Sequence, residues 1–345
     1  MLTVVSVTLF AAVVATAVVF RHELVALFAS REAAPRAGPS ISPSVTSSPS
    51  PSPSPTRSPK PRGELVIHGT GDVNLDPSYI PALAANGYGH AWSGLGDLFR
   101  RDDLTVVNLE CAISELGAPV PKEFNFRGPP EALGPMAEAG VEVANLGNNH
   151  ARDYGPEALV DTRRNLAEAE IAPVGAGKDD RQASRPALFR VKGWKIAVLG
   201  FGGVVPDPTW IAGQGNPGMA DGDSIPDMVR AVRAAGRKAD LVFVSIHWGV
   251  ELDTQPRPED VERAHAMIDA GADAIFGHHP HRLQPMGEYR GRPIFWSLGN
   301  FVWPNFSAAG STTAVAEVRV GPKGRVTGRL LPAFIESPGH PVLAG

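Results

Sequence analysis

The chain has 345 residues, of which 43% are hydrophobic, enough for one large domain or two small ones with a sizeable core. Its 32 Lys and Arg residues against 36 Asp and Glu give a formal net charge of -4, and this balance excludes a basic nucleic-acid-binding surface as the main feature. The single cysteine, Cys111, excludes an internal disulfide and a cysteine-based zinc cluster.

The chain opens with an uninterrupted apolar run over residues 2–20. A run of roughly 19 apolar residues is long enough to cross a bilayer core of about 30 Å as a helix. We therefore predict a transmembrane anchor over residues 1–22; a cleaved signal peptide is the alternative, although no basic residue precedes the run. Arg21, Arg31 and Arg36 follow the run, and taken alone they favour a cytoplasmic location for what comes next.

A second segment, residues 37–62, consists almost entirely of Pro, Ser, Thr and Gly. Such a composition cannot bury apolar surface, and we predict a disordered linker that extends by about 3.1 Å per residue where it is Pro-rich. An anchor followed by a stiff linker is typical of a domain displayed outside the cell. We therefore expect a single-pass protein of the cell membrane with its globular part extracytoplasmic, although a linker alone would be equally soluble in the cytoplasm.

From residue 63 onward, apolar strand patterns alternate with amphipathic helix patterns, which predicts an α/β domain. Strands are expected at 64–72, 104–110, 141–147, 195–203, 241–249, 274–281, 293–303, 312–320 and 325–335. Helices are expected at 129–140, 155–171, 223–240 and 257–273. The β-rich end predicts a mixed sheet or a second sheet.

Polar residues follow five of these apolar strands, at the place where α/β folds collect their functional residues. They are Asp72, Asn108, Glu110, Asn148, Asn149, His150, His247, His278, His279 and His281. Imidazole and carboxylate together suit divalent Zn, Mn and Fe. Two such cations, roughly 3.5–4 Å apart, would bind a phosphoryl or carbonyl group and activate a water molecule, so no serine or cysteine nucleophile is required.

Six sequence blocks resemble, in order, those of the CapA/PgsA capsule proteins: GTGDVNLD, VNLECAIS, ANLGNNHARDYG, SIHWGVE, GHHPHRLQP and PIFWSLGNFVW. That family in turn is similar to the calcineurin-like metallophosphatases. The resemblance implies a sandwich of two mixed β-sheets flanked by helices over residues 63–335, with a dinuclear metal site in the loops after the strands. The metal ligands that it implies are Asp72, Asn74, Glu110, Asn149, His247, His279 and His281.

Roles are expected for two further residues, the first implied by the resemblance and the second by its position three residues after that histidine. His150 matches the histidine that protonates a leaving group or stabilises the transition state. Asp153 either orients His150 or caps the helix that begins near Pro156. One position departs from the metallophosphatase pattern, because Asn74 stands where that superfamily has histidine, and an amide oxygen binds a metal more weakly than imidazole does.

These observations leave three functional hypotheses. The first is a metal-dependent, phosphoesterase-like hydrolase that uses two divalent ions (Mn, Fe or Zn) on an anionic envelope polymer or its phosphorylated precursor. The second is a non-catalytic, membrane-anchored subunit of a poly-gamma-glutamate synthesis and export complex, in which the cations bind the polymer. The third is a plain surface-display module, which has no need for the strand-end set of polar residues. No nucleic-acid partner is expected.

Overall fold

The computed structural model describes residues 61–344. The predicted anchor at 1–22 lies outside these residues, as does nearly all of the predicted linker at 37–62. Within 61–344, no helix has the length and apolar character needed to cross a membrane.

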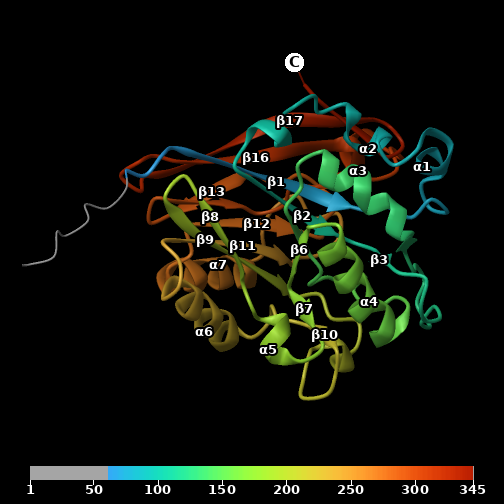
Figure 1. Cartoon of the computed structure of the whole chain (residues 1–345), viewed down its shortest axis with the longest axis horizontal. Coiled ribbons are helices and arrows are strands. Elements are labelled where there is room, and N and C mark those ends of the chain that lie inside the picture. Colours follow the sequence, from blue (N-terminus) through green and yellow to red (C-terminus); the bar gives the residue numbers. More distant parts are fainter. Residues whose placement is uncertain (1–60, 345) are drawn as a thin grey trace, which may run out of the picture. The chain divides into compact units, whose positions relative to one another are not determined.

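Two mixed sheets form the centre of the fold (Figure 1). The first has the order β18-β17-β16-β1-β2-β5-β6, with β15 pairing to the end of β1. Its strands are β1 (Leu65–Val73), β2 (Leu104–Leu109), β5 (Val143–Asn145), β6 (Ala172–Val174), β15 (Asn300–Val302), β16 (Thr312–Val320), β17 (Val326–Ser337) and β18 (His340–Leu343). Strands β1, β2, β5 and β6 run parallel, and β16 to β18 are antiparallel additions.

The second sheet has the order β13-β14-β12-β11-β9-β8. Its strands are β8 (Ala187–Val191), β9 (Trp194–Gly202), β11 (Leu241–His247), β12 (Ala274–His278), β13 (Met286–Tyr289) and β14 (Arg292–Phe295). The four inner strands are parallel, and the edge strands β8 and β13 are antiparallel to their neighbours. Two short pairs complete the strands: β3 (Ala112–Ile113) with β4 (Arg127–Gly128), and β7 (Ala176–Gly177) with β10 (Gly218–Met219).

The two sheets pack face to face, because one buried apolar cluster draws side chains from both, including Ile67 and Val106 from the first and Phe243 and Phe276 from the second. The approach is close: a Cβ added at Gly69 would lie 2.5 Å from the Phe276 ring, so glycine is required there.

Helices flank this sandwich. They are α1 (Pro81–Asn86), α2 (His90–Ser93), α3 (Leu133–Glu138), α4 (Gly155–Glu168), α5 (Asp180–Ala183), α6 (Ile225–Gly236), α7 (Pro258–Ala270) and α8 (Ala308–Ser311). Three 3₁₀ turns lie at Phe99–Arg101, Pro130–Ala132 and Pro208–Trp210. Apolar residues of α1 to α4 join one buried cluster with the first sheet, while those of α6 and α7 join another with the second.

The predicted α/β class with two mixed sheets flanked by helices is therefore confirmed. The four predicted helices correspond to α3, α4, α6 and α7. The expected strand at 293–303 is divided into β14 and β15, which belong to different sheets. The first sheet also continues through β18, beyond the predicted domain end at residue 335.

Glu142, at the start of β5, gives the fold a testable pH dependence. Its carboxylate accepts a hydrogen bond from the Thr105 N–H at 2.7 Å, and burial raises its pKa to about 7. A raised pKa in the folded state means that stability is full below the ordinary carboxyl pKa and is lost as pH rises towards 7. Glu142→Gln keeps an acceptor for Thr105 without the charge, so its melting temperature relative to wild type should rise between pH 4.5 and 7. The exposed Glu262→Gln should show no such trend in the same calorimetric series.

Candidate metal centre

The candidate site lies where the carboxyl ends of strands from both sheets meet. In the first sheet, the register places Asp72 of β1 opposite Asn108 of β2 and also opposite Asn300 of β15. In the second sheet, His247 at the end of β11 is opposite His278 at the end of β12. Each strand therefore delivers a polar side chain at the same level, which is how a parallel sheet builds a site from residues distant in sequence.

A close approach of backbones holds this edge together. The Asp72 N–H donates to the Gly299 carbonyl at 2.9 Å, and a Cβ on Gly71 would lie only 2.0 Å from that oxygen. Glycine at position 71 thus permits β1 to meet the loop before β15. The ladder between β1 and β2 also shifts register between Gly69 and Asp72, a bulge that redirects the side chain at the strand end.

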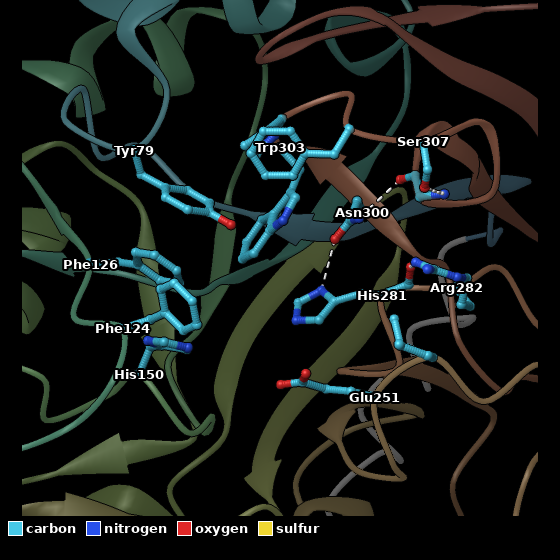
Figure 2. A pocket seen from close by; sticks show the side chains of 14 residues that line it. Tyr79, Phe124, Phe126, His150, Glu251, His281, Arg282, Asn300, Trp303 and Ser307 are labelled. Carbon is cyan, nitrogen blue, oxygen red and sulfur yellow. Dashed lines mark hydrogen bonds between the residues drawn. The ribbon is translucent and has the colours of Figure 1, made fainter.

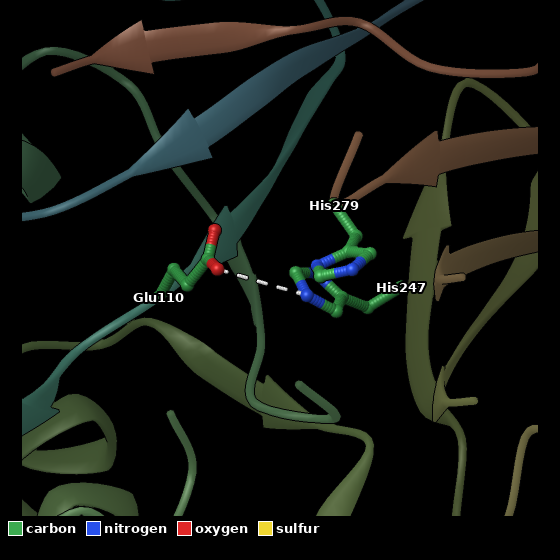
Figure 3. Close-up of side chains that lie close together, drawn as sticks. All are labelled: Glu110, His247 and His279. Carbon is green, nitrogen blue, oxygen red and sulfur yellow. Dashed lines mark ion pairs between the residues drawn. The ribbon is translucent and has the colours of Figure 1, made fainter. Parts of the chain in front are cut away.

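Glu110 is the centre of the arrangement. It is fully buried, and neither of its carboxylate oxygens has a hydrogen-bond partner among the described residues. One group of potential ligand atoms, all within 4.8 Å of one another, joins Glu110 with His247 and His279 (Figure 3). A second such group joins the same carboxylate with Asp72 and His281. A buried carboxylate without a partner is costly, so its position between two sets of ligands fits a carboxylate that binds cations on both sides.

The first group is extended by an amide. Glu110 Oε1 lies 3.6 Å from His247 Nε2, and the Asn149 Oδ1 atom lies 2.8 Å from the same nitrogen. The His279 Nδ1 atom is buried and has no hydrogen-bond partner within residues 61–344. Carboxylate, amide and two imidazoles thus border one space, and this is a donor set that divalent transition metals accept.

The second group is oriented by hydrogen bonds from outside it. His281 Nδ1 lies 2.8 Å from Asn300 Oδ1 and 3.1 Å from Asp72 Oδ2, so a proton on Nδ1 is held there. The other nitrogen, Nε2, then faces Glu110 Oε1 at 3.8 Å with a free lone pair. Asp72 also accepts a hydrogen bond from Asn108 Nδ2 at 2.9 Å. Such outer partners fix the tautomer and direction of metal-binding histidines.

His150 lies at the edge of the same centre and is held by Asp153. His150 Nδ1 donates to Asp153 Oδ2 at 2.6 Å, which leaves Nε2 facing Glu110 Oε1 at 3.9 Å. Asp153 also accepts a hydrogen bond from Lys122 Nζ at 2.7 Å and one from the Phe126 N–H at 2.7 Å. The Asp153 side chain contacts His150 and does not cap α4, whose N-cap is Tyr154 and makes no side-chain cap; its orienting role stays a prediction.

The Asn74 side chain is engaged locally. Its Oδ1 accepts a hydrogen bond from the Asp76 N–H at 2.9 Å, an Asx turn that holds the loop after β1. Its Nδ2 is buried without a hydrogen-bond partner in the described part of the chain. The role of Asn74 as a metal ligand therefore stays a prediction. In this structure its side-chain oxygen holds the loop after β1.

Burial dominates the electrostatics of the centre. It lowers the pKa of His279 to about 3 and of His278 to about 4, and it holds the pKa of His247 well below its usual range. Burial, together with the neighbouring Asp72 carboxylate, raises the pKa of Glu110 well above its usual range. These imidazoles are thus neutral, the form that binds metals.

Asp72 and His281 titrate differently because they are paired. Burial opposes the charge on both, but the hydrogen bond between them prevails: the pKa of Asp72 is lowered and the pKa of His281 is raised. Burial also lowers the pKa of His150 against the opposing effect of Asp153. The site therefore combines one ionised carboxylate with several neutral imidazoles.

The backbone at the His-Pro-His turn is strained. His279 has φ 97° and His281 has φ 51°, both in the left-handed region that residues with a side chain rarely adopt. Each such residue costs about 1–3 kcal/mol unless its surroundings hold it in place. Strain at two potential ligands indicates that the turn is kept for the position of its imidazoles.

This strain predicts an unusual order of stabilities. The free energy of unfolding of His279→Gly should be about 1 kcal/mol higher than that of His279→Ala, because glycine adopts φ 97° without a Cβ clash. At the neighbouring strand residue His278, where φ is ordinary, the order should be reversed. Urea titration with a chelator present measures both pairs; an alanine variant as stable as the glycine variant at 279 would contradict the account.

Three residues support the site although they are outside the set of ligands and catalytic residues expected from the sequence. His278 is buried at the end of β12. Its Nε2 atom lies 2.9 Å from Ser245 Oγ and its Nδ1 atom lies 3.7 Å from Asp72 Oδ1, so His278 packs behind the Asp72 carboxylate. Asn300 lies in the last of the six resemblance blocks, and its Oδ1 atom orients the His281 ring. Lys122 comes from a loop without periodicity, and its only sequence signal is its place between the resemblance blocks.

Comparison with known proteins identifies a family and several relatives over the same region of the chain that contains the site. Residues 66–305 match the family described as "Bacterial capsule synthesis protein PGA_cap". The chain is 37% identical over 189 residues to "Capsule biosynthesis protein CapA" of Bacillus anthracis, covering 53% of this chain and 45% of that protein. It is 36% identical over 210 residues to "PGA biosynthesis protein CapA" of Bacillus subtilis, covering 60% and 54%.

A third relative, a "Probable polyglutamine synthesis accessory protein" of Mycobacterium tuberculosis, is 33% identical over 234 residues, covering 63% of this chain and 60% of that protein. The matched region thus spans about half the length of these curated relatives. Among solved structures, the Haemophilus influenzae NAD nucleotidase overlaps with TM-score 0.49 and 16% identity, covering 79% of this chain and 50% of that one; a likeness this distant supports no functional conclusion. The family match covers more than half of the chain and includes every strand-end block, and the chain belongs to the bacterial capsule synthesis protein PGA_cap family.

Proposed function

We propose that this chain is a CapA-like protein of capsule or poly-gamma-glutamate biosynthesis whose centre binds two divalent cations and hydrolyses a phosphate ester at the cell envelope. The observation that carries the proposal is Glu110, a buried carboxylate without a hydrogen-bond partner in residues 61–344 that belongs to two separate groups of ligand atoms. Mn, Fe and Zn all suit these donors. The relatives named for capsule and PGA biosynthesis support the biological setting.

The ligand set divides naturally between the two groups. Asp72 and His281 would hold one cation, Asn149, His247 and His279 the other, and Glu110 both. Two bound cations would polarise a phosphoryl oxygen and lower the pKa of a water molecule toward about 7.

The chain's own contribution to the reaction comes from His150. Asp153 holds the His150 ring so that Nε2 faces the centre. In the imidazolium form, which carries a proton on both nitrogens, Nε2 can deliver its proton to the departing alcohol oxygen. Lys122 holds Asp153 in place through its hydrogen bond to Oδ1. No nucleophilic side chain is needed when water attacks.

We also propose the location as a single-pass protein of the cell membrane, with the domain outside and residues 1–22 as its anchor. The apolar run and the Pro/Ser-rich segment of the sequence support this arrangement. Its expected substrate is an anionic envelope polymer or a phosphorylated precursor.

One observation favours a second candidate. The Asn74 oxygen is engaged by the Asp76 N–H, at a position where metallophosphatases have a histidine ligand. A weaker first cation site would suit a non-catalytic subunit of a poly-gamma-glutamate synthesis complex, in which the cations bind the anionic polymer.

One experiment separates the two. The full chain, loaded with Mn or Zn, is assayed on a panel of phosphoesters and gamma-glutamyl peptides beside the variant His279→Ala with His281→Ala. We expect metal-dependent hydrolysis of a phosphoester by wild type, and loss of both metal and turnover in the variant at unchanged circular dichroism. Turnover at full rate in the variant would refute the site; bound metal without turnover on any substrate would favour the non-catalytic subunit.

A further inference from the structure

A cavity of about 230 Å³ opens directly beside the candidate metal centre. Its wall includes His150 at the edge of the centre and the potential ligands His281 and Glu251. Figure 2 shows Tyr79, Phe126 and His150 on one side of the cavity and His281, Glu251 and Arg282 on the other. A molecule bound at the centre would therefore extend into this space.

The cavity wall beside both histidines is aromatic. The Phe126 ring stacks on the His150 ring at a centroid distance of 4.3 Å, and Trp303 lies 4.7 Å from the His281 ring. The Tyr79 and Phe126 ring centroids are 4.6 Å apart, so Tyr79 extends the aromatic surface away from the centre. Aromatic faces of this kind bind flat or apolar rings through stacking and edge contacts.

The aromatic surface continues to the mouth of the cavity. Phe306 is 79% exposed and Phe124 is 51% exposed, and both rings lie within 6.4 Å of the Tyr79 ring. Two large aromatic side chains left in water at a cavity mouth lose free energy unless a ligand covers them. Their exposure is therefore a second sign that an apolar group binds here.

The charges of the cavity argue against a polyanion as its occupant. Apart from its histidines and Tyr79, the lining contains one anionic residue, Glu251, and one cationic residue, Arg282. The Arg282 Nη1 atom already donates to the His281 carbonyl at 2.7 Å. A gamma-glutamyl chain brings one carboxylate per residue, and this wall offers no row of cations to match it.

We propose that this cavity binds the leaving alcohol of a phosphate ester and selects an alcohol that carries a flat, uncharged ring. The proposal rests on the proposed function, because it takes His150 as the proton donor to the leaving group. Since His150 forms part of the cavity wall, the group that receives its proton occupies this side of the centre. A space of about 230 Å³ is below the usual 300–1,000 Å³ of drug-sized ligand sites, which fits one ring system and not a polymer segment.

The reaction consumes only the phosphate ester and one water molecule. Water attacks phosphorus and forms a new P–O bond, while the P–O bond to the alcohol breaks and its electron pair remains on the alcohol oxygen. His150 acts in its imidazolium form, with a proton on both ring nitrogens: Nε2 gives its proton to that oxygen, and the proton lost by the attacking water returns to Nε2. The products are the free ring-bearing alcohol and phosphate.

The test compares benzyl phosphate with ethyl phosphate, both esters of primary alcohols that differ in the ring. We expect the full, metal-loaded chain to prefer benzyl phosphate by at least about tenfold in kcat/KM. Phe124→Ala with Phe306→Ala should bring the ratio close to one while metal content stays at the wild-type level. Phe334→Ala removes an exposed aromatic residue of β17 that does not line the cavity, and it should keep the wild-type ratio.

A binding measurement keeps this proposal separate from the hydrolase proposal. Calorimetry with benzylphosphonate and ethylphosphonate, which are not hydrolysed, should show the same preference and the same loss in the double variant. A preference in binding without any turnover would support the cavity and refute the hydrolase. Equal affinity for the two phosphonates, or a preference that survives Phe124→Ala with Phe306→Ala, would overturn the cavity proposal.

Discussion

Glu110→Gln is expected to remove hydrolysis and to reduce bound metal from two equivalents to one or none. The amide keeps the shape of the side chain but cannot bind two cations with negative charge. Removing even an outer partner of a metal ligand lowers activity or affinity by about 10–100-fold, so loss of the shared carboxylate should exceed that. Elemental analysis and the phosphoester assay on the same preparation measure both effects.

The same substitution should not weaken the metal-free fold. Glu110 is buried, and its oxygens lack hydrogen-bond partners among the described residues, so the wild-type carboxyl group destabilises the protein when no cation is bound. Glu251→Gln is the matched control, because this exposed carboxylate forms the third potential ligand group with His279 and His281. Metal retained in Glu110→Gln but lost in Glu251→Gln would show that the wrong carboxylate has been assigned.

His150→Ala is expected to give the opposite combination, with both metals retained and turnover lowered by about 10²–10⁴-fold, the usual contribution of a general acid. The His150 Nε2 atom faces the centre, but its role in the account is to supply a proton and not to bind metal. Asp153→Asn should lower turnover less, because the ring remains while its orienting carboxylate is lost.

The choice of leaving group provides the control for His150. An ester whose alcohol leaves readily without protonation, such as 4-nitrophenyl phosphate, should lose much less rate in His150→Ala than an alkyl ester does. An equal loss on both esters would assign His150 a structural role. Loss of metal in His150→Ala would make it a ligand instead.

The strand and helix patterns predicted most of the scaffold, because hydrophobic periodicity reports burial directly. The buried strand expected at 64–72 is β1, and the amphipathic pattern at 155–171 is α4. Sequence patterns did not reveal that residues 293–303 pass from one sheet to the other, since the chain leaves β14 and enters β15 within four residues. Sheet membership depends on partner strands that are distant in sequence.

The part of the candidate site that lies at the carboxyl ends of strands could be predicted from the sequence. Asp72, Glu110 and His281 were expected to converge, and their potential ligand atoms lie within 4.8 Å of one another. His278 and Lys122 show what strand ends cannot reveal. His278 and His279 are adjacent, yet the positive φ of His279 alters the chain direction after β12, so alternation along the strand does not tell which imidazole faces the centre. Lys122 reaches Asp153 from a loop, and only tertiary contacts reveal it.

The aromatic cavity could not be predicted from sequence patterns either. Tyr79, Phe126 and Trp303 come from three separate loops, and each of them alone reads as an ordinary core residue. Their common feature is a shared wall with His150 and His281, which exists only after the two sheets have packed.

The most direct test of the proposed two-cation centre is the metal content of the full chain after exposure to Mn and Zn and removal of free ions. We expect close to two equivalents of metal per wild-type chain, a marked decrease in Glu110→Gln, and a rise in melting temperature that a strong chelator reverses. A folded wild-type chain that binds no metal, with a melting temperature indifferent to both cations and chelator, would contradict it.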